Sequence, residues 1–145
     1  CFSGILFNHE SKLRPKNFII PKVMKYIKDR NFNKKLLLGD LSAIKDFGWA
    51  EEYIKIIHSL MKKNFNEDIV IATGKSQKLS YIVKDIFKKF DLDWKKHVKF
   101  SNKLARPHEN KYVYADISKL KKFKMPPKFT FPQIIDFLTQ NDLNK

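Results

Sequence analysis

Three polar segments of the sequence carry side chains that could bind a phosphorylated ligand. The first is Asn8-His9-Glu10-Ser11, which follows an apolar run and is joined by Arg14 five residues after His9. An amide, an imidazole and a guanidinium together suit a ribose-phosphate ligand. Ligands in open α/β folds bind at loops that follow the carboxyl ends of strands, which favours this interpretation. The same residues would also make an ordinary polar turn, and both interpretations stay open at this point.

The other two segments combine a cation with a carboxylate. Lys45 and Asp46 lie in a predicted loop, residues 39–48, that leads into a helix. The lysine could meet an anion just before the helix begins, whereas Asp46 could equally cap or shape a turn. Arg106 and Glu109 are three residues apart with a proline between them, so they could grip a diphosphate and a ribose diol or form a surface salt bridge. Across the three segments fall two of the three arginines, Arg14 and Arg106, and the guanidinium fork suits phosphate.

No complete catalytic set is found in the 145 residues. There is no G-x-S-x-G nucleophile elbow, and no G-x-G-x-x-G turn follows a predicted strand. The four histidines show no metal-ligand spacing. We therefore predict no catalytic residue and no metal site in this chain.

Composition favours one folded domain over residues 1–145. The chain is 43% hydrophobic and has 13 phenylalanines, which argues against disorder, and it has no apolar run long enough to span a bilayer. Its single cysteine fits a reducing cytoplasm.

The formal charge of +15 by default indicates nucleic-acid or membrane affinity. Nearly all of this charge is lysine spread along the sequence, so we interpret it as background on solvated helix faces and expect neither partner. A rival hypothesis, a small basic nucleic-acid-binding module, requires lysines on one face with interleaved aromatic side chains.

Short apolar runs alternate with helical periodicity, which predicts an α/β fold. We expect strands at residues 3–8, 36–39, 69–72 and 97–100. A polar loop at 8–16 follows the first strand. We expect helices at residues 17–30, with Asn17 as a possible cap, at 50–63, at 77–90, from 116 or 118 to 122, and at 130–138, the last opened by a capping box at Thr130-Phe-Pro-Gln133. Two of these helices have a clear apolar stripe that should face the core: Tyr53, Ile54, Ile57, Leu60 and Met61 in the second, and Leu79, Ile82, Val83, Ile86 and Phe87 in the third.

Taken in order, these segments resemble the GDP-mannose 4,6-dehydratases of the extended short-chain dehydrogenase/reductase superfamily. Gly4-Ile-Leu-Phe-Asn-His-Glu-Ser11 resembles the family's G-I-L-F-N-H-E-S, and Asp68-Ile-Val-Ile-Ala-Thr-Gly74 resembles D-F-V-I-A-T-G. Leu38-Gly39 with Lys45-Asp-Phe-Gly48 resembles L-G-N/D followed by R-D-W-G, and Arg106-Pro-His-Glu109 resembles R-P-x-E. Order and spacing hold over roughly residues 1–116.

The resemblance implies roles for individual residues. His9 and Arg14 match positions that contact NADP, and Asn8 and Lys22 match positions in the sugar-nucleotide pocket. The resemblance implies further that Arg106 and Glu109 hold the diphosphate and a ribose or base-side hydroxyl. Lys45 stands where the family has an arginine, and Lys12 and Leu13 depart from its P-R-R pattern.

The resemblance also implies an activity for the parent enzyme and a missing half for this chain. The family converts GDP-mannose to GDP-4-keto-6-deoxymannose with NADP, using a glycine-rich turn, a Thr/Glu pair and a Tyr-x-x-x-Lys pair that would lie upstream of Cys1. We therefore expect a C-terminal GDP-sugar-binding domain that is inactive alone. Residues 1–16 would be the edge of the missing NADP-binding domain, including one strand of its Rossmann sheet.

That strand would lack sheet partners here, so we expect self-association, which would give a homo-oligomer, or a rearranged amino terminus. The alternative within the superfamily is a domain of another NAD(P)-dependent nucleotide-sugar epimerase, dehydratase or reductase.

Overall fold

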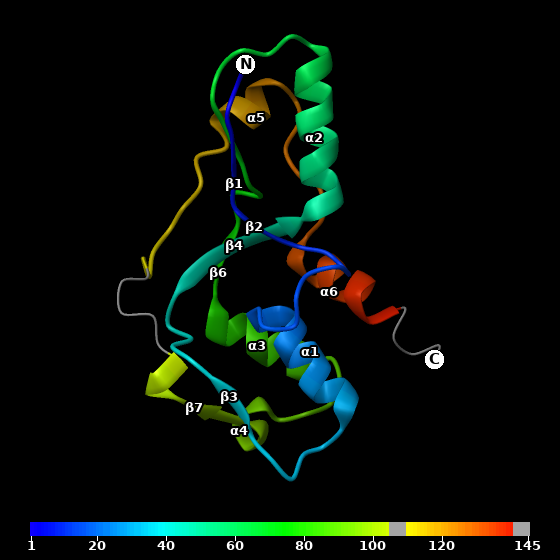
Figure 1. Cartoon of the computed structure of the whole chain (residues 1–145), viewed down its shortest axis with the longest axis vertical. Helices are drawn as coiled ribbons and strands as arrows, with labels where there is room; N and C mark the ends of the chain where they lie inside the picture. Colours follow the sequence, from blue (N-terminus) through cyan, green and yellow to red (C-terminus); the bar gives the residue numbers. More distant parts are fainter. Residues whose placement is uncertain (105–109, 141–145) are drawn as a thin grey trace. The chain divides into compact units, whose positions relative to one another are not determined.

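The computed structural model describes residues 1–104 and 110–140 (Figure 1). The chain divides into two compact units, each assembled from segments that are distant in sequence. Unit 1 comprises residues 1–12, 45–76 and 113–145, and unit 2 comprises residues 13–44 and 77–112.

Unit 1 is built on two pairs of short parallel strands. β1 (Gly4–Leu6) pairs with β5 (Ile69–Ile71), with Gly4 opposite Ile69. β2 (Asn8–Glu10) pairs with β4 (Ile44–Trp49), with Asn8 opposite Phe47, and β4 is the middle strand of a sheet in the order β2-β4-β6. The chain passes between the units within β4 and again within β6 (Ser76–Lys78).

Three helices complete unit 1: α2 (Ala50–Lys62), α5 (Ser118–Lys122) and α6 (Phe131–Gln140). α5 contacts β5, and α2 turns its Tyr53, Ile56 and Leu60 into the same core. The buried core of this unit consists of Tyr53, Ile56, Leu60, Ile69, Ile71, Ala72, Ile117 and Leu120. Burial of these apolar side chains is the main force that holds the short strands in place.

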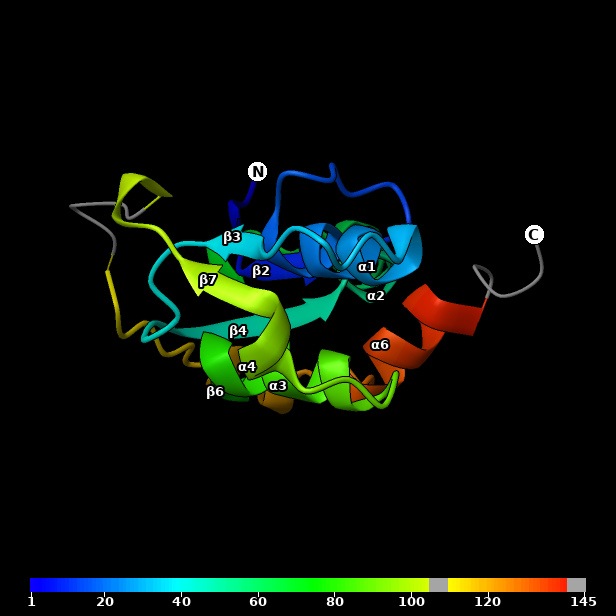
Figure 2. The same cartoon turned by 90° about the horizontal axis from the view of Figure 1, so that it is seen from below.

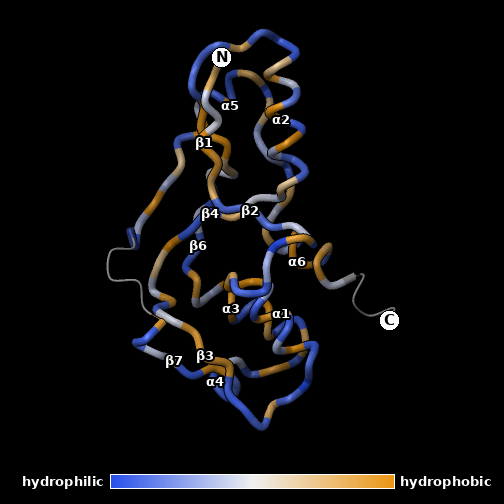
Figure 3. Tube along the Cα trace, in the orientation of Figure 1, coloured by the Kyte–Doolittle hydropathy of each residue, from blue (hydrophilic) through white to orange (hydrophobic). Residues whose placement is uncertain are grey.

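Unit 2 packs two helices beside a two-stranded parallel sheet. α1 (Ile19–Asp29) contacts α3 (Leu79–Lys88) and β3 (Leu36–Leu38), and β3 pairs with β7 (Val98–Phe100). The single turn α4 (Trp94–His97) leads directly into β7, and a 3-10 turn covers Asn102–Leu104 (Figure 2). The tube in Figure 3 is orange, that is hydrophobic, along β1 and β3, whose strands are formed almost entirely by apolar residues.

Most of the predicted elements are confirmed. All five predicted helices are present, and α3 buries all five residues of its predicted stripe. The capping box is also present, because Gln133 Oε1 accepts hydrogen bonds from the Thr130 main-chain nitrogen at 2.8 Å and from its hydroxyl at 2.9 Å.

Four expectations about local structure are wrong. Residues 8–10 and 44–49 are strands rather than loops, because each supplies the other's main-chain partners. Phe18 rather than Asn17 occupies the N-cap of α1. In α2 the inward residue is Ile56, while Ile54 and Met61 are exposed.

The strand expected to lack sheet partners has one. β1 pairs in register with β5, so the physical reason given for self-association is weakened. Its outer residues are nevertheless open to solvent, with Ile5 exposed to 53%.

Gly48 and Tyr53 provide a test of the packing in unit 1. A Cβ atom at Gly48 would overlap the buried Tyr53 ring, whereas one at Gly4 would meet its nearest atoms at an ordinary 3.5 Å. We expect Gly48→Ala to lower the free energy of unfolding by about 1–3 kcal/mol, because the ring must move out of a filled core. Urea denaturation followed by circular dichroism measures this, with Gly4→Ala as the control. Equal effects of the two substitutions would contradict the packing described here.

Candidate functional site

Pairing of β2 with β4 brings two of the polar segments together in unit 1. Asn8 lies opposite Phe47, and its side-chain Nδ2 donates a hydrogen bond to the main-chain oxygen of Asp46 at 3.4 Å. Asn8 is partly buried, so its carboxamide is both held by the neighbouring strand and partly accessible. The expected donor-acceptor side chain is therefore fixed by a strand rather than carried on a loop.

The carboxylate of Asp46 organises the turn that follows β5. It is fully buried and accepts hydrogen bonds at its Oδ1 from the main-chain nitrogen of Thr73 at 3.2 Å and the Thr73 hydroxyl at 2.6 Å. Its Oδ2 accepts from the main-chain nitrogen of Lys75 at 3.2 Å. Hydrogen bonds to an ionised acceptor are the strong ones, and a buried carboxylate needs them. Of the two roles left open for Asp46, shaping a turn is the one that the structure supports.

Gly74 allows this turn to close. Its φ of +71° is in the left-handed region, and a Cβ there would lie 2.8 Å from the Ile117 side chain. Both observations favour a residue without a side chain. Because β1 and β5 are parallel, the turn lies at the same edge as the chain that leaves β1 toward Asn8.

The partly buried His9 lies beside the buried Tyr53 in unit 1. The imidazole Nδ1 lies 2.8 Å from the main-chain oxygen of Phe7, which can only accept, so the ring hydrogen is on Nδ1. The centres of the two rings are 5.4 Å apart. Burial raises the pKa of the Tyr53 phenol, and the charges of Asp46 and Glu52 raise it further. Tyr53 therefore keeps its proton at neutral pH and cannot act there as a base.

Lys45 is partly buried in β4, five positions before α2 begins. The expectation that it stands just before a helix is wrong, because a strand takes up the intervening residues. An anion at Lys45 would therefore meet the ammonium without the help of the helix N-terminus.

Arg14 and Lys22 lie in unit 2. The Arg14 guanidinium carbon is 4.2 Å from the centre of the Phe18 ring, a cation–π contact. Lys22 is on α1, and its Nζ donates to the main-chain oxygen of Leu37 at 2.7 Å. An ammonium has three donors, so two remain for other acceptors. Arg106 and Glu109 lie outside the described residues.

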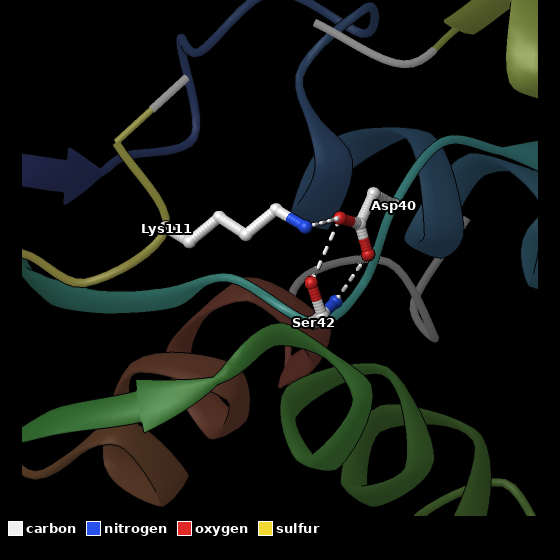
Figure 4. A network of polar contacts seen from close by, with 3 residues as sticks. All are labelled: Asp40, Ser42 and Lys111. Atoms are coloured by element: carbon white, nitrogen blue, oxygen red, sulfur yellow. Dashed lines mark hydrogen bonds and ion pairs between the residues drawn. The ribbon is translucent and has the colours of Figure 1, made fainter. Parts of the chain in front are cut away.

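Unit 2 also contains a compact polar network in the segment after β3 (Figure 4). Asp40 accepts from the main-chain nitrogen of Ser42 at 2.7 Å and from its hydroxyl at 2.8 Å, and Lys111 Nζ lies 3.2 Å from its Oδ2. The Ser42 hydrogen bonds, followed by that of Lys111, lower the pKa of Asp40 from 3.8 to about 2.

Sequence reasoning missed Thr73 and Gly48. Neither residue would touch a ligand in the expected way, since Thr73 holds Asp46 and Gly48 makes room for Tyr53. A small polar residue at the end of a strand, followed by glycine, was the available signal for the turn at Thr73. In residues 1–104 and 110–140 no group of three or more His, Cys, Asp or Glu is placed to hold a metal, and no helix there is long and apolar enough to cross a membrane.

Comparison with known proteins identifies relatives over most of the chain. A family model described as GDP-mannose 4,6 dehydratase matches residues 1–137. GDP-mannose 4,6 dehydratase 1 of Arabidopsis thaliana is 31% identical over 144 residues, which cover 97% of this chain and 40% of that protein. The human GDP-mannose 4,6 dehydratase is 27% identical and is covered to 43% of its length. The chain therefore spans about two fifths of the relatives that it matches.

Solved structures show the same fold. The dTDP-glucose 4,6-dehydratase of Bacillus anthracis, determined in complex with NAD, superposes with a TM-score of 0.84 at 19% identity. The match covers 96% of this chain and 43% of that one. The described residues therefore have the architecture of part of an extended short-chain dehydrogenase/reductase, as the sequence predicted.

The hydrogen bond between Thr73 and Asp46 can be tested by its effect on stability. We expect Thr73→Val to lower the free energy of unfolding by about 1.5–3 kcal/mol, because a buried carboxylate loses a hydroxyl donor while the side-chain shape is kept. Thr73→Ser keeps the donor and should cost less. Equal losses in the two variants, measured by urea denaturation, would show that the hydroxyl contributes nothing.

The Asp40 network makes a prediction about pH. Since the folded-state pKa is depressed to about 2, this carboxylate stabilises unit 2 above about pH 4 and loses that effect as the pH falls toward 2. Ser42→Ala should raise the pKa of Asp40 more than Lys111→Ala does. Titration of the Asp40 side-chain carbon by NMR measures both shifts, and a larger effect of Lys111 would contradict this order of causes.

Proposed function

The chain belongs to the GDP-mannose 4,6-dehydratase family, and we propose that it is the GDP-sugar-binding part of such an enzyme. The observation that carries the proposal is the family match over residues 1–137, which includes all of the polar segments. The hydrogen bonds that link Asn8, Asp46 and Thr73 support it, because three segments resembling the family's motifs meet in one unit.

The proposed ligand contacts divide between phosphates and hydroxyls. Arg106 would bind the diphosphate through its guanidinium fork, and Glu109 would accept from a ribose or base-side hydroxyl. Lys22 and Lys45 would supply further positive charge, with Lys45 as a point charge where the family has arginine. Asn8 could donate and accept toward the sugar while it remains anchored on β4.

The parent enzyme of this family uses a nicotinamide cofactor, and we propose that it is NADP, with His9 and Arg14 as the contacts within this chain. When bound, that cofactor takes up and returns the hydride. His9 can meet it only with the ring edge that carries Nε2, because Nδ1 is engaged with the Phe7 carbonyl. Arg14 would present its guanidinium from its contact with the Phe18 ring.

We further propose that these 145 residues do not turn over GDP-mannose unaided. They contain neither a glycine-rich dinucleotide turn nor a Tyr-x-x-x-Lys pair. The phenol of Tyr53 is no substitute, because its pKa is raised by burial. Binding should be weak, in the millimolar range or near it, because much of a pocket wall would lie in the remainder of the parent enzyme.

Ligand titration monitored by amide NMR tests this function. We expect GDP-mannose and GDP to shift resonances of the proposed contacts, and ADP or UDP-glucose to shift them less at equal concentration. Lys22→Gln should weaken GDP binding by roughly tenfold, since a charge-assisted contact is lost. The matched control is Lys25→Gln, which removes an exposed lysine from the same helix that is paired with Asp29.

Two results would count against the proposal. Equal shifts with GDP, ADP and UDP-glucose would remove the support for a guanine-specific ligand and favour another nucleotide-sugar enzyme as the parent. Equal weakening by Lys22→Gln and Lys25→Gln would show that GDP responds only to overall charge.

A further inference from the structure

The positive charge of this protein is concentrated in one of its two units. Unit 2 contains 18 of the 30 Lys and Arg residues but 6 of the 15 Asp and Glu residues, a formal net charge of +12. Unit 1 carries the remaining +3. A bias that affected the whole sequence evenly would give the two units similar charges. The interpretation of the lysines as uniform background is therefore incomplete.

Within unit 2, the segment from Trp94 to Lys103 carries positive charge and no negative charge. It contains Lys95, Lys96, Lys99 and Lys103, all exposed, and no acidic residue. None of these four ammonium groups forms an ion pair with a described residue. The nearest carboxylate in sequence, Asp93, is engaged in capping α4, where it accepts from the main-chain nitrogen of Lys95 at 3.1 Å. No carboxylate in the described part of the chain therefore neutralises these four charges.

Two aromatic side chains lie among these lysines. Trp94 is partly buried and Phe100 is exposed to 57%, and their rings are 6.4 Å apart in an edge-to-face arrangement. Phe100 ends β7, where it pairs with Leu38, so the backbone that carries it is held by a neighbouring strand. An exposed aromatic side chain leaves apolar surface in contact with water. A ligand that stacks on the ring would bury this surface and gain free energy from it.

From this combination we propose that the segment Trp94–Lys103, here called the basic aromatic segment, binds single-stranded nucleic acid. Lysines with no ion-pair partner among residues 1–104 and 110–140 attract the phosphates, and aromatic rings offer faces on which bases stack without regard to sequence. α4 is a single turn, too short to enter the major groove of a duplex as a recognition helix. This activity is separate from GDP-sugar binding and uses none of the residues proposed for it.

A titration with a 15-nucleotide thymidine oligomer tests the proposal. The chain has two tryptophans, so in a Trp49→Phe background the emission reports on Trp94 alone. We expect quenching of Trp94 with a dissociation constant in the micromolar range at low salt. The logarithm of the affinity should fall with the logarithm of salt concentration with a slope near −3, since four lysines would release about 0.7 counterion each.

Charge-matched variants locate the site. Lys95→Gln/Lys96→Gln/Lys99→Gln should weaken binding at least tenfold and reduce the salt slope by about 2. The control Lys62→Gln/Lys63→Gln/Lys121→Gln removes the same charge from exposed lysines of unit 1 and should change the affinity by less than about twofold. Phe100→Leu should weaken binding severalfold while leaving the salt slope unchanged, because it removes a stacking face and no charge. Thermal melts of all variants check that they remain folded.

Three outcomes would overturn the proposal. Equal weakening by the two triple variants would show that the whole charge of the chain is responsible. Saturation without a change in Trp94 emission would place the oligomer elsewhere. Binding to vesicles of phosphatidylserine and phosphatidylcholine, with none to the oligomer, would assign the basic aromatic segment to an anionic membrane surface.

Discussion

The buried carboxylate of Asp46 is the constraint on which the arrangement of unit 1 depends. A charge removed from water is tolerated only where polar partners surround it, and here the partners are the Thr73 hydroxyl and the main-chain nitrogens of Thr73 and Lys75. These donors come from the chain that leaves β5, whereas Asp46 lies on β4. The Asp46 side chain therefore links the end of the β1–β5 pair to β4 of the β2–β4 pair. Asn8 on β2 donates a hydrogen bond to the main-chain oxygen of the same residue.

Two glycines make this arrangement sterically possible. Gly48 lies under the Tyr53 ring, which lets α2 follow β4 without an intervening loop, and Gly74 takes the positive φ that the turn needs. The sequence motifs that resemble the family's, Lys45-Asp-Phe-Gly48 and Ala72-Thr-Gly74, thus have a structural explanation. Asp46 and Thr73 bind one another, and the glycine in each motif permits a close approach. In this region the motif residues would therefore serve ligand binding by fixing the backbone that surrounds the ligand.

The parts of the fold that the sequence predicted are those governed by local periodicity. The stripe on α3 and the apolar runs at β3 and β5 repeat on a scale of a few residues, so burial follows from spacing. β2 and β4 were missed because each is polar or mixed and becomes a strand only by pairing with a segment about forty residues away. The site divides in the same way. Asn8 and Asp46 were identified as polar residues worth attention, but their mutual contact depends on a register that no local pattern specifies.

The two units also handle charge differently, which bears on how each can serve a ligand. Ion pairs are found in both units, Lys55 with Glu51 in unit 1 and Lys25 with Asp29 in unit 2, but only in unit 1 do acids nearly match bases in number. In unit 2, bases outnumber acids three to one, and the resulting repulsion opposes the compact state. Screening by salt reduces that cost for charges further apart than about 8–10 Å. A polyanion bound to unit 2 would reduce the repulsion among its lysines and would itself be attracted to them. The excess charge that lowers the stability of unit 2 alone would therefore raise its stability when the polyanion is bound.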